Sequence, residues 1–159
     1  MKSATIHELK QEMSQLKPAE LSALCLRLAR FKKENKELLT YLLFEAHDED
    51  GYIAAVKKEI DEQFETINLS HLYFVKKSLR KILRGINKHI RYTGSKQAEV
   101  EWLLYFCTLI ADSGIPVQKN TVINNIFNSQ LKKLFAAIDT LHEDLQYDYI
   151  RQAEKLSAK

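Results

Sequence analysis

The sequence contains few of the residues that interrupt a helix, with four glycines and two prolines among 159 residues. Folds rich in strands need frequent turns, and turns depend on these two residue types. Their scarcity therefore argues against a β-rich fold and favours long helices. Long apolar runs are missing as well, because no stretch approaches the roughly 18 uninterrupted apolar residues of a membrane-spanning helix. We expect no membrane segment.

Cysteine is also rare, with Cys25 and Cys107 as the two cysteines of the chain. Both lie in apolar helical patterns, where a free thiol usually behaves as a small buried hydrophobic residue. The N-terminus alternates charged and apolar residues and lacks the continuous apolar stretch of a secretion signal. We therefore expect a cytoplasmic protein with reduced cysteines.

Motifs for catalysis and for metal binding are missing or incomplete. There is no Gly-x-Ser-x-Gly elbow, glycine-rich phosphate loop, His-Glu-x-x-His or Cys-x-x-Cys. Residues 46–52 match a calcium loop only in part, because Ala46 and Lys57 occupy two ligand positions. Asp139 and His142 lie three apart, but a metal site would need further ligands. We predict no enzyme activity, no cofactor and no metal site, although residues distant in sequence can still assemble a catalytic site.

Apolar residues recur at helical spacing through almost the whole chain. Thr5 and Glu8 match a capping box, and Ser70 can cap another helix. The wide apolar stripe of residues 18–31 predicts a central helix, and residues 100–111, which include Trp102, are apolar on all sides and predict deep burial. The predicted helices cover roughly 5–17, 18–31, 34–47, 51–67, 70–93, 96–111 and 122–141, followed by a final helical turn at 149–155.

These elements predict a single all-α domain over residues 1–159, with about seven helices. The connections are short, so consecutive helices should stack as antiparallel helical hairpins. A closed bundle and a short α-superhelix both fit this pattern. We expect the last few residues, from Lys155 onward, to fray.

Residues 66–98 contain no acidic residue but eight Lys and Arg residues, in a chain with a net charge of +3. On a helical wheel, the apolar side chains of residues 70–93 gather within about 100° of arc. The cations occupy the opposite side, spread over roughly 140°. We define the basic face as Lys77, Arg80, Lys81, Arg84, Lys88, Arg91, Tyr73 and Tyr92.

Two interpretations of this basic face remain open. It can form an electrostatic footprint for phosphates, with the two tyrosines as stacking groups. Alternatively, residues 45–65, with eight acids against two lysines, can flank the face and neutralise part of it. Gly85 lies within the same predicted helix, where it would mark either a close approach of a ligand or a close helix crossing.

We predict that the chain is a non-catalytic helical interaction module. Its basic face would recognise a protein partner or another copy of the same chain, because asymmetric charge steers association. Nucleic-acid binding through the same face is the alternative prediction. A modest net charge of +3 and the lack of a helix-turn-helix or stacking motif make it the second choice.

Overall fold

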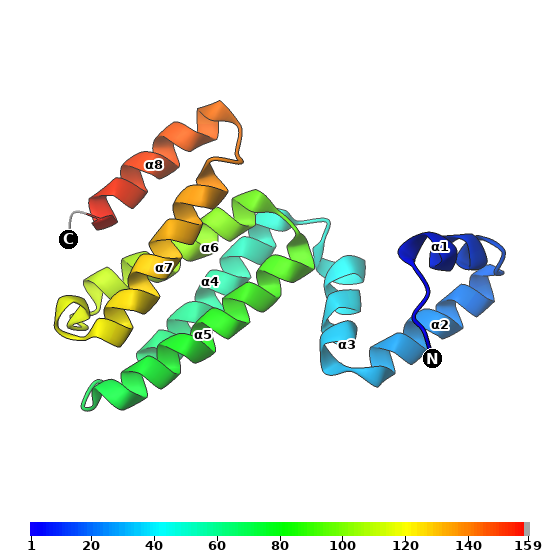
Figure 1. Cartoon of the computed structure of the whole chain (residues 1–159), viewed down its shortest axis with the longest axis horizontal. Helices are drawn as coiled ribbons and strands as arrows, with labels where there is room; N and C mark the ends of the chain where they lie inside the picture. The colour runs from blue at the N-terminus through cyan, green and yellow to red at the C-terminus, as the bar shows by residue number, and fades with distance from the viewer. Residues whose placement is uncertain (158–159) are drawn as a thin grey trace. The chain divides into compact units, whose positions relative to one another are not determined.

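The computed structural model describes residues 1–157 and is all-helical in that range, as the sequence predicts (Figure 1). It contains eight α-helices within the described residues, close to the predicted seven, and no strand. The helices are α1 (Ile6–Ser14), α2 (Pro18–Phe31), α3 (Lys33–Thr40), α4 (Glu49–Glu65), α5 (Leu72–Thr93), α6 (Lys96–Asp112), α7 (Thr121–Ile138) and α8 (Glu143–Ser157). A π-helical turn, η1 (Tyr41–Glu45), and a 3-10 turn, η2 (Val117–Lys119), complete the list.

Contacts divide the chain into two compact units, Met1–Phe44 and the chain from Glu45 onward. We call them unit 1 and unit 2 and describe each by itself. The single domain over residues 1–159 stays a prediction. Within unit 2, successive helices run antiparallel, as expected for stacked hairpins (Figure 1).

Unit 1 begins with the predicted capping box. The Glu8 backbone N–H donates to Thr5 Oγ1 at 3.3 Å, and the Thr5 N–H donates to Glu8 Oε2 at 2.7 Å. Pro18 starts α2, because proline fits the first turn, where its missing N–H costs nothing. After α3 the backbone continues into η1, so the helix predicted over 34–47 ends in a widened turn.

Burial in unit 1 is low and contradicts one sequence prediction. Tyr41 is the one buried residue of Met1–Phe44. The prediction that α2 is a central helix is wrong, because α2 contains no buried residue. Cys25 on the same helix is exposed, against the expectation of a buried thiol. A wide apolar stripe predicts burial only if another element covers it.

Unit 2 contains the hydrophobic core, and α6 is its central helix. This helix packs against α4, α5, α7 and α8. Its buried residues are Ala98, Val100, Trp102, Leu103, Leu104, Phe106, Cys107 and Ile110. Trp102 is fully buried, and its indole Nε1 donates to the Ile53 carbonyl at 3.2 Å. The prediction of a deeply buried helix with a core tryptophan is confirmed.

The helix that carries the basic face is continuous, as predicted. α5 runs for 22 residues and buries Val75, Leu79, Ile82, Leu83 and Ile86 along one side. Gly94 ends it with φ 62°, a left-handed conformation in which glycine avoids the Cβ penalty. The predicted Ser70 cap is wrong. The Ser70 N–H and hydroxyl both donate to Asn68 Oδ1, and His71 becomes the N-cap without a side-chain bond.

The last third of the chain differs from the prediction of one long helix over 122–141. The structure breaks the helix after Ile138 and forms a full second helix, α8. The Gln146 side chain explains the break, because its Nε2 donates to the carbonyls of Asp139 and Leu141. Leu156 is buried in α8, while residues 158–159 lie outside the described residues. None of the helices within residues 1–157 has the length and apolar character of a membrane span.

Candidate interaction surface

α5 presents most of the basic face to solvent. Six members of the face are exposed: Tyr73, Lys77, Arg80, Lys81, Arg84 and Arg91. Lys88 and Tyr92 are half-buried. The separation follows from the helical period, since the apolar side chains of α5 pack into the unit 2 core and the cations occupy the opposite side.

The exposed cations of α5 lack counter-charges. In the described part of the chain, no carboxylate forms an ion pair with Lys77, Arg80, Lys81, Arg84 or Arg91. Surface pairs would contribute only about 0–1 kcal/mol each to stability, but they would reduce the electrostatic field outside the protein. The positive field of α5 is therefore open to a ligand.

Three of the six acids of α4 have partners other than the cations of the basic face. Asp61 accepts a hydrogen bond from the Tyr105 hydroxyl at 2.6 Å. Glu59 lies 3.3 Å from His89 Nε2, and Glu49 accepts from the Ser95 hydroxyl at 2.5 Å. These carboxylates face α6, the α5–α6 connection and the histidine on the flank of α5. Sequence position alone could not distinguish these partners from the lysines and arginines.

A hollow of about 590 Å³ runs along α5. The residues that line it recur at three- and four-residue spacing and are Tyr73, Lys76, Lys77, Arg80, Leu83, Arg84 and Asn87. Four of these seven side chains are cationic, and Leu83 and Tyr73 add apolar surface. The hollow thus combines positive charge with an apolar base.

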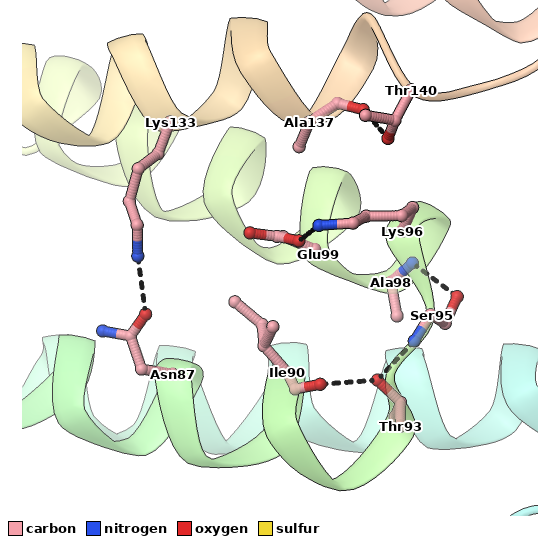
Figure 2. Close-up of polar contacts among 10 residues, drawn as sticks. All are labelled: Asn87, Ile90, Thr93, Ser95, Lys96, Ala98, Glu99, Lys133, Ala137 and Thr140. Carbon is pink, nitrogen blue, oxygen red and sulfur yellow. Dashed lines mark hydrogen bonds and ion pairs between the residues drawn. The ribbon is translucent and has the colours of Figure 1, made fainter.

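One hydrogen bond joins an end of this hollow to α7 (Figure 2). Lys133 Nζ on α7 donates to Asn87 Oδ1 on α5 at 3.1 Å. Within α5, Asn87 Nδ2 donates to the Leu83 carbonyl at 2.8 Å. Figure 2 also shows the turn into α6, where the Ser95 hydroxyl accepts from the Ala98 N–H at 3.2 Å. Of these bonds, the one between Lys133 and Asn87 joins α5 to α7.

A second hollow, of about 360 Å³, lies between α5 and α7. Its lining is Arg80, Val122, Asn125, Ile126, Ser129 and Gln130. Arg80 borders both hollows and is therefore the central cation of the surface. Gln130 is buried, and within residues 1–157 its Oε1 has no hydrogen-bond partner.

The sequence analysis did not identify Asn87, Lys133 or Gln130. One signal was available for Gln130, because a glutamine stands in a row of buried apolar residues on α7, between Phe127 and Leu134. No sequence pattern indicated that Asn87 and Lys133 would contact each other. They are separated by 46 positions and meet only because α7 folds back beside α5.

Gly85 does not mark a helix crossing. A Cβ built at this position would meet no heavy atom within 4 Å, apart from the local helix backbone. The prediction of a close crossing is therefore wrong. Close approach of a ligand to this backbone stays a prediction.

The other chemically reactive groups lie away from the basic face. Burial raises the pKa of the Cys107 thiol to about 12, so this cysteine stays protonated at neutral pH. His142 and Asp144 form an exposed pair at 3.3 Å. In the range 1–157, no three His, Cys, Asp or Glu side chains gather in a metal-binding arrangement.

The surface of α5 presents exposed cations and the exposed Tyr73 to solvent, above the buried Leu83. Family models, curated proteins and solved structures all give no match to this chain, so the function is argued from these residues.

Proposed function

We propose that the chain is a non-catalytic helical interaction module that binds an acidic protein surface along α5. One observation supports the proposal most strongly. Five exposed cations of the basic face, Lys77, Arg80, Lys81, Arg84 and Arg91, lack a carboxylate partner in the described residues. Such an open charge array attracts a ligand of opposite charge and speeds its association.

The composition of the hollow supports a protein ligand. Protein interfaces are enriched in arginine and tyrosine, and they combine an apolar centre with a polar rim. Here Leu83 and Tyr73 lie among Lys77, Arg80 and Arg84. From Lys77 to Arg91 the cations extend over roughly 21 Å of helix, which matches the length of a helical or extended acidic segment of a partner.

The partner can also be another copy of this chain. Residues 45–65 contain eight acidic residues against two lysines, and they would complement α5 of a neighbouring molecule. A rise in apparent mass with concentration, measured by analytical ultracentrifugation and reduced at high salt, would identify this form of the interaction.

Nucleic-acid binding is a second candidate, favoured by the exposed Tyr73 next to Lys77. A base can stack on the tyrosine while the cations contact phosphates. This candidate makes a distinct prediction about salt. If α5 makes six phosphate contacts, its affinity for nucleic acid should fall roughly a thousandfold when the salt concentration rises from 50 to 200 mM.

The test reverses three charges on α5 and leaves the core untouched, with Lys77→Glu, Arg80→Glu and Arg84→Glu combined. Lys88 is kept because it is half-buried and takes part in other interactions. The control variant reverses three exposed lysines elsewhere in unit 2, with Lys58→Glu, Lys119→Glu and Lys155→Glu. Both variants change the net charge equally, so non-specific electrostatics cancel in the comparison.

We expect the α5 variant to lose capture of its partner from the native cell and the control variant to retain it. Both should keep the helical circular dichroism and a melting temperature near that of the parent, because exposed substitutions rarely exceed 0.5 kcal/mol. Capture that disappears after nuclease treatment would establish the nucleic-acid candidate instead. An unfolded α5 variant would show that these cations are structural. The predicted cytoplasmic location belongs to this proposal and is tested by cell fractionation.

A further inference from the structure

Unit 1 carries a second surface, unrelated to α5, whose apolar side chains are uncovered. Leu26 and Phe31 on α2 and Leu43 and Phe44 in η1 are 52%, 76%, 64% and 65% exposed. Four exposed large apolar residues on two neighbouring elements form a patch rather than scattered single positions. Patches of this kind on a protein surface mark interaction sites.

The patch is concave. It forms a hollow of about 720 Å³, within the size range of roughly 300–1,000 Å³ that is typical of ligand sites. The residues that line it all belong to unit 1 and are Leu26, Ala29, Arg30, Phe31, Lys32, Lys33, Lys36, Leu39, Thr40, Leu43 and Phe44. We call this hollow the unit 1 groove.

The rim of the groove is positively charged. Four of its lining residues are Lys or Arg and none is acidic. Lys33 has an ion-pair partner, Glu37, at 3.7 Å, but its side chain is 86% exposed. Arg30, Lys32 and Lys36 form no ion pair among the residues described.

The π-helical turn η1 helps to build the groove. In a π-helical turn the backbone bonds from residue i to i+5, so one extra residue enters the turn and the side chains shift around the axis. Leu42, Leu43 and Phe44 are consecutive and all are exposed. In a regular α-helix, consecutive residues point in directions about 100° apart. Turns of this type frequently occur at functional sites.

We propose that the unit 1 groove binds an amphipathic helix whose apolar stripe is flanked by acidic residues. A helix supplies apolar side chains at positions i, i+3, i+4 and i+7, and these fill hollows between partner helices. Carboxylates beside that stripe then face Arg30, Lys32 and Lys36. Charge complementarity therefore selects an acidic helix over a neutral or basic one.

Two other occupants fit less well. A second copy of unit 1 would bring the two cationic rims together, and residues 1–44 contain eight Lys and Arg against five acids. An anionic membrane would accept the charge, but a bilayer surface suits a helix with a convex apolar face. The apolar residues here line a hollow. Both alternatives are outcomes of the experiment below.

The experiment uses the full chain and a designed fluorescent peptide of about 16 residues, or roughly 24 Å of helix. The probe carries leucines on one helical face and glutamates elsewhere. One comparison peptide has the same composition with the leucines scattered around the helix, and another has lysine in place of each glutamate. Fluorescence anisotropy at physiological salt should give micromolar affinity for the probe and at least about tenfold weaker binding of both comparison peptides.

Variants then locate the binding surface. Phe31→Ser with Leu43→Ser should weaken probe binding by about tenfold or more, and Lys32→Glu with Lys36→Glu should do the same. Leu69→Ser in unit 2 serves as the control for loss of an exposed apolar residue. All replaced residues are exposed. Circular dichroism of each variant is the check that it folds.

Each remaining outcome overturns the proposal. It fails if no peptide binds, if the lysine or scattered peptide binds equally well, or if Phe31→Ser with Leu43→Ser has no effect. It also fails if those two substitutions abolish self-association or binding to phosphatidylserine vesicles instead of probe binding. Probe binding that depends on Arg80 and Arg84 but not on Phe31 would overturn the unit 1 groove and leave the proposed role of α5 intact.

Discussion

At the scale of single residues, Gly85 and Gln130 are the positions where the sequence and its surroundings fit least well. Gly85 lies inside a long helix without a neighbour that requires it. Gln130 is buried with an acceptor that forms no hydrogen bond in the described structure. Each of these two positions therefore offers a test by substitution.

Replacing Gly85 with alanine should stabilise the folded chain by about 0.5–1 kcal/mol. Alanine loses less backbone entropy in a helix, and its Cβ would meet no heavy atom within 4 Å. Chemical denaturation measures the change. The matched control is Gly114→Ala, which should destabilise the chain because Gly114 has φ 72°. A destabilised Gly85→Ala variant would mean that α5 packs against something near this position.

Replacing Gln130 with methionine should also stabilise the fold, by about 1–2 kcal/mol. The substitution keeps the length of the side chain and removes a buried acceptor that carries a desolvation cost. Urea denaturation checks the result, with Asn125→Met as a control for an exposed polar residue on the same helix. A loss of stability would contradict the expected gain from removing this buried acceptor.

At the scale of helices, polar bridges to α6 supplement the apolar packing of unit 2. The Tyr105 hydroxyl on α6 donates to Asp61 on α4 at 2.6 Å. Tyr149 on α8 donates to Glu101 on α6, and Lys57 on α4 pairs with the same carboxylate at 2.5 Å. These bonds fix the register of three helices, because each joins residues far apart in sequence.

The Tyr105 bridge predicts a pH dependence of stability. The hydrogen bond to the Asp61 carboxylate, together with burial and the negative charge, raises the pKa of Tyr105 to about 12 from its usual value of 10. The folded chain holds the proton more tightly than the unfolded chain. The contribution of the Tyr105–Asp61 hydrogen bond to stability is therefore complete below pH 10 and is lost as the pH rises through about 12.

Tyr105→Phe should therefore lower the free energy of unfolding at pH 8 by about 1 kcal/mol, since one hydrogen bond is lost. The same variant should lose less stability than the parent between pH 9 and 11.5. Urea denaturation across this range measures both effects, with the exposed Tyr147→Phe as a control. If the variant and the parent lost the same stability between pH 9 and 11.5, the Tyr105–Asp61 hydrogen bond would not be the cause of the pH dependence.

At the scale of the whole molecule, charge and burial are unevenly distributed along the chain. The core is built in unit 2, and unit 1 contains one buried residue. The net charge of +3 equals the excess of Lys and Arg over acids in residues 1–44. In the rest of the chain, the numbers of basic and acidic residues are therefore equal. Within that balanced remainder the charges are separated, because residues 66–98 are free of acids. The basic face follows from this separation, and the cationic rim of the unit 1 groove lies in residues 1–44, which carry the net positive charge.

Much of the local structure could be predicted because local signals determine it. The capping box at Thr5, the start of α2 at Pro18 and the stop at Gly94 depend on backbone chemistry within a few residues. The amphipathic pattern of α5 was equally readable, since the helical period alone separates its two faces. The predicted members of the basic face accordingly lie on one helix, six of them exposed.

The errors arose where a contact that the pattern does not show decides the outcome. Ser70 was predicted to cap α5, but its hydroxyl donates a hydrogen bond to Asn68 Oδ1 instead. The apolar stripe of α2 predicted a central helix, yet α2 contains no buried residue. Gly85 suggested a crossing, but no neighbouring helix approaches it. A pattern shows that a face is apolar or a residue is small, but it does not show what lies opposite.

The sequence alone determined that this chain is helical, where most of its helices begin and end, and that one of them is cationic on its outer side. These properties depend on interactions across one or two turns of backbone. Only the tertiary structure decided that Glu49, Glu59 and Asp61 of α4 contact neighbours other than the basic face, that Lys133 meets Asn87, and that the apolar residues of α2 and η1 line an open groove. Those outcomes depend on contacts between distant segments, and the geometry of such contacts is set by how the helices pack.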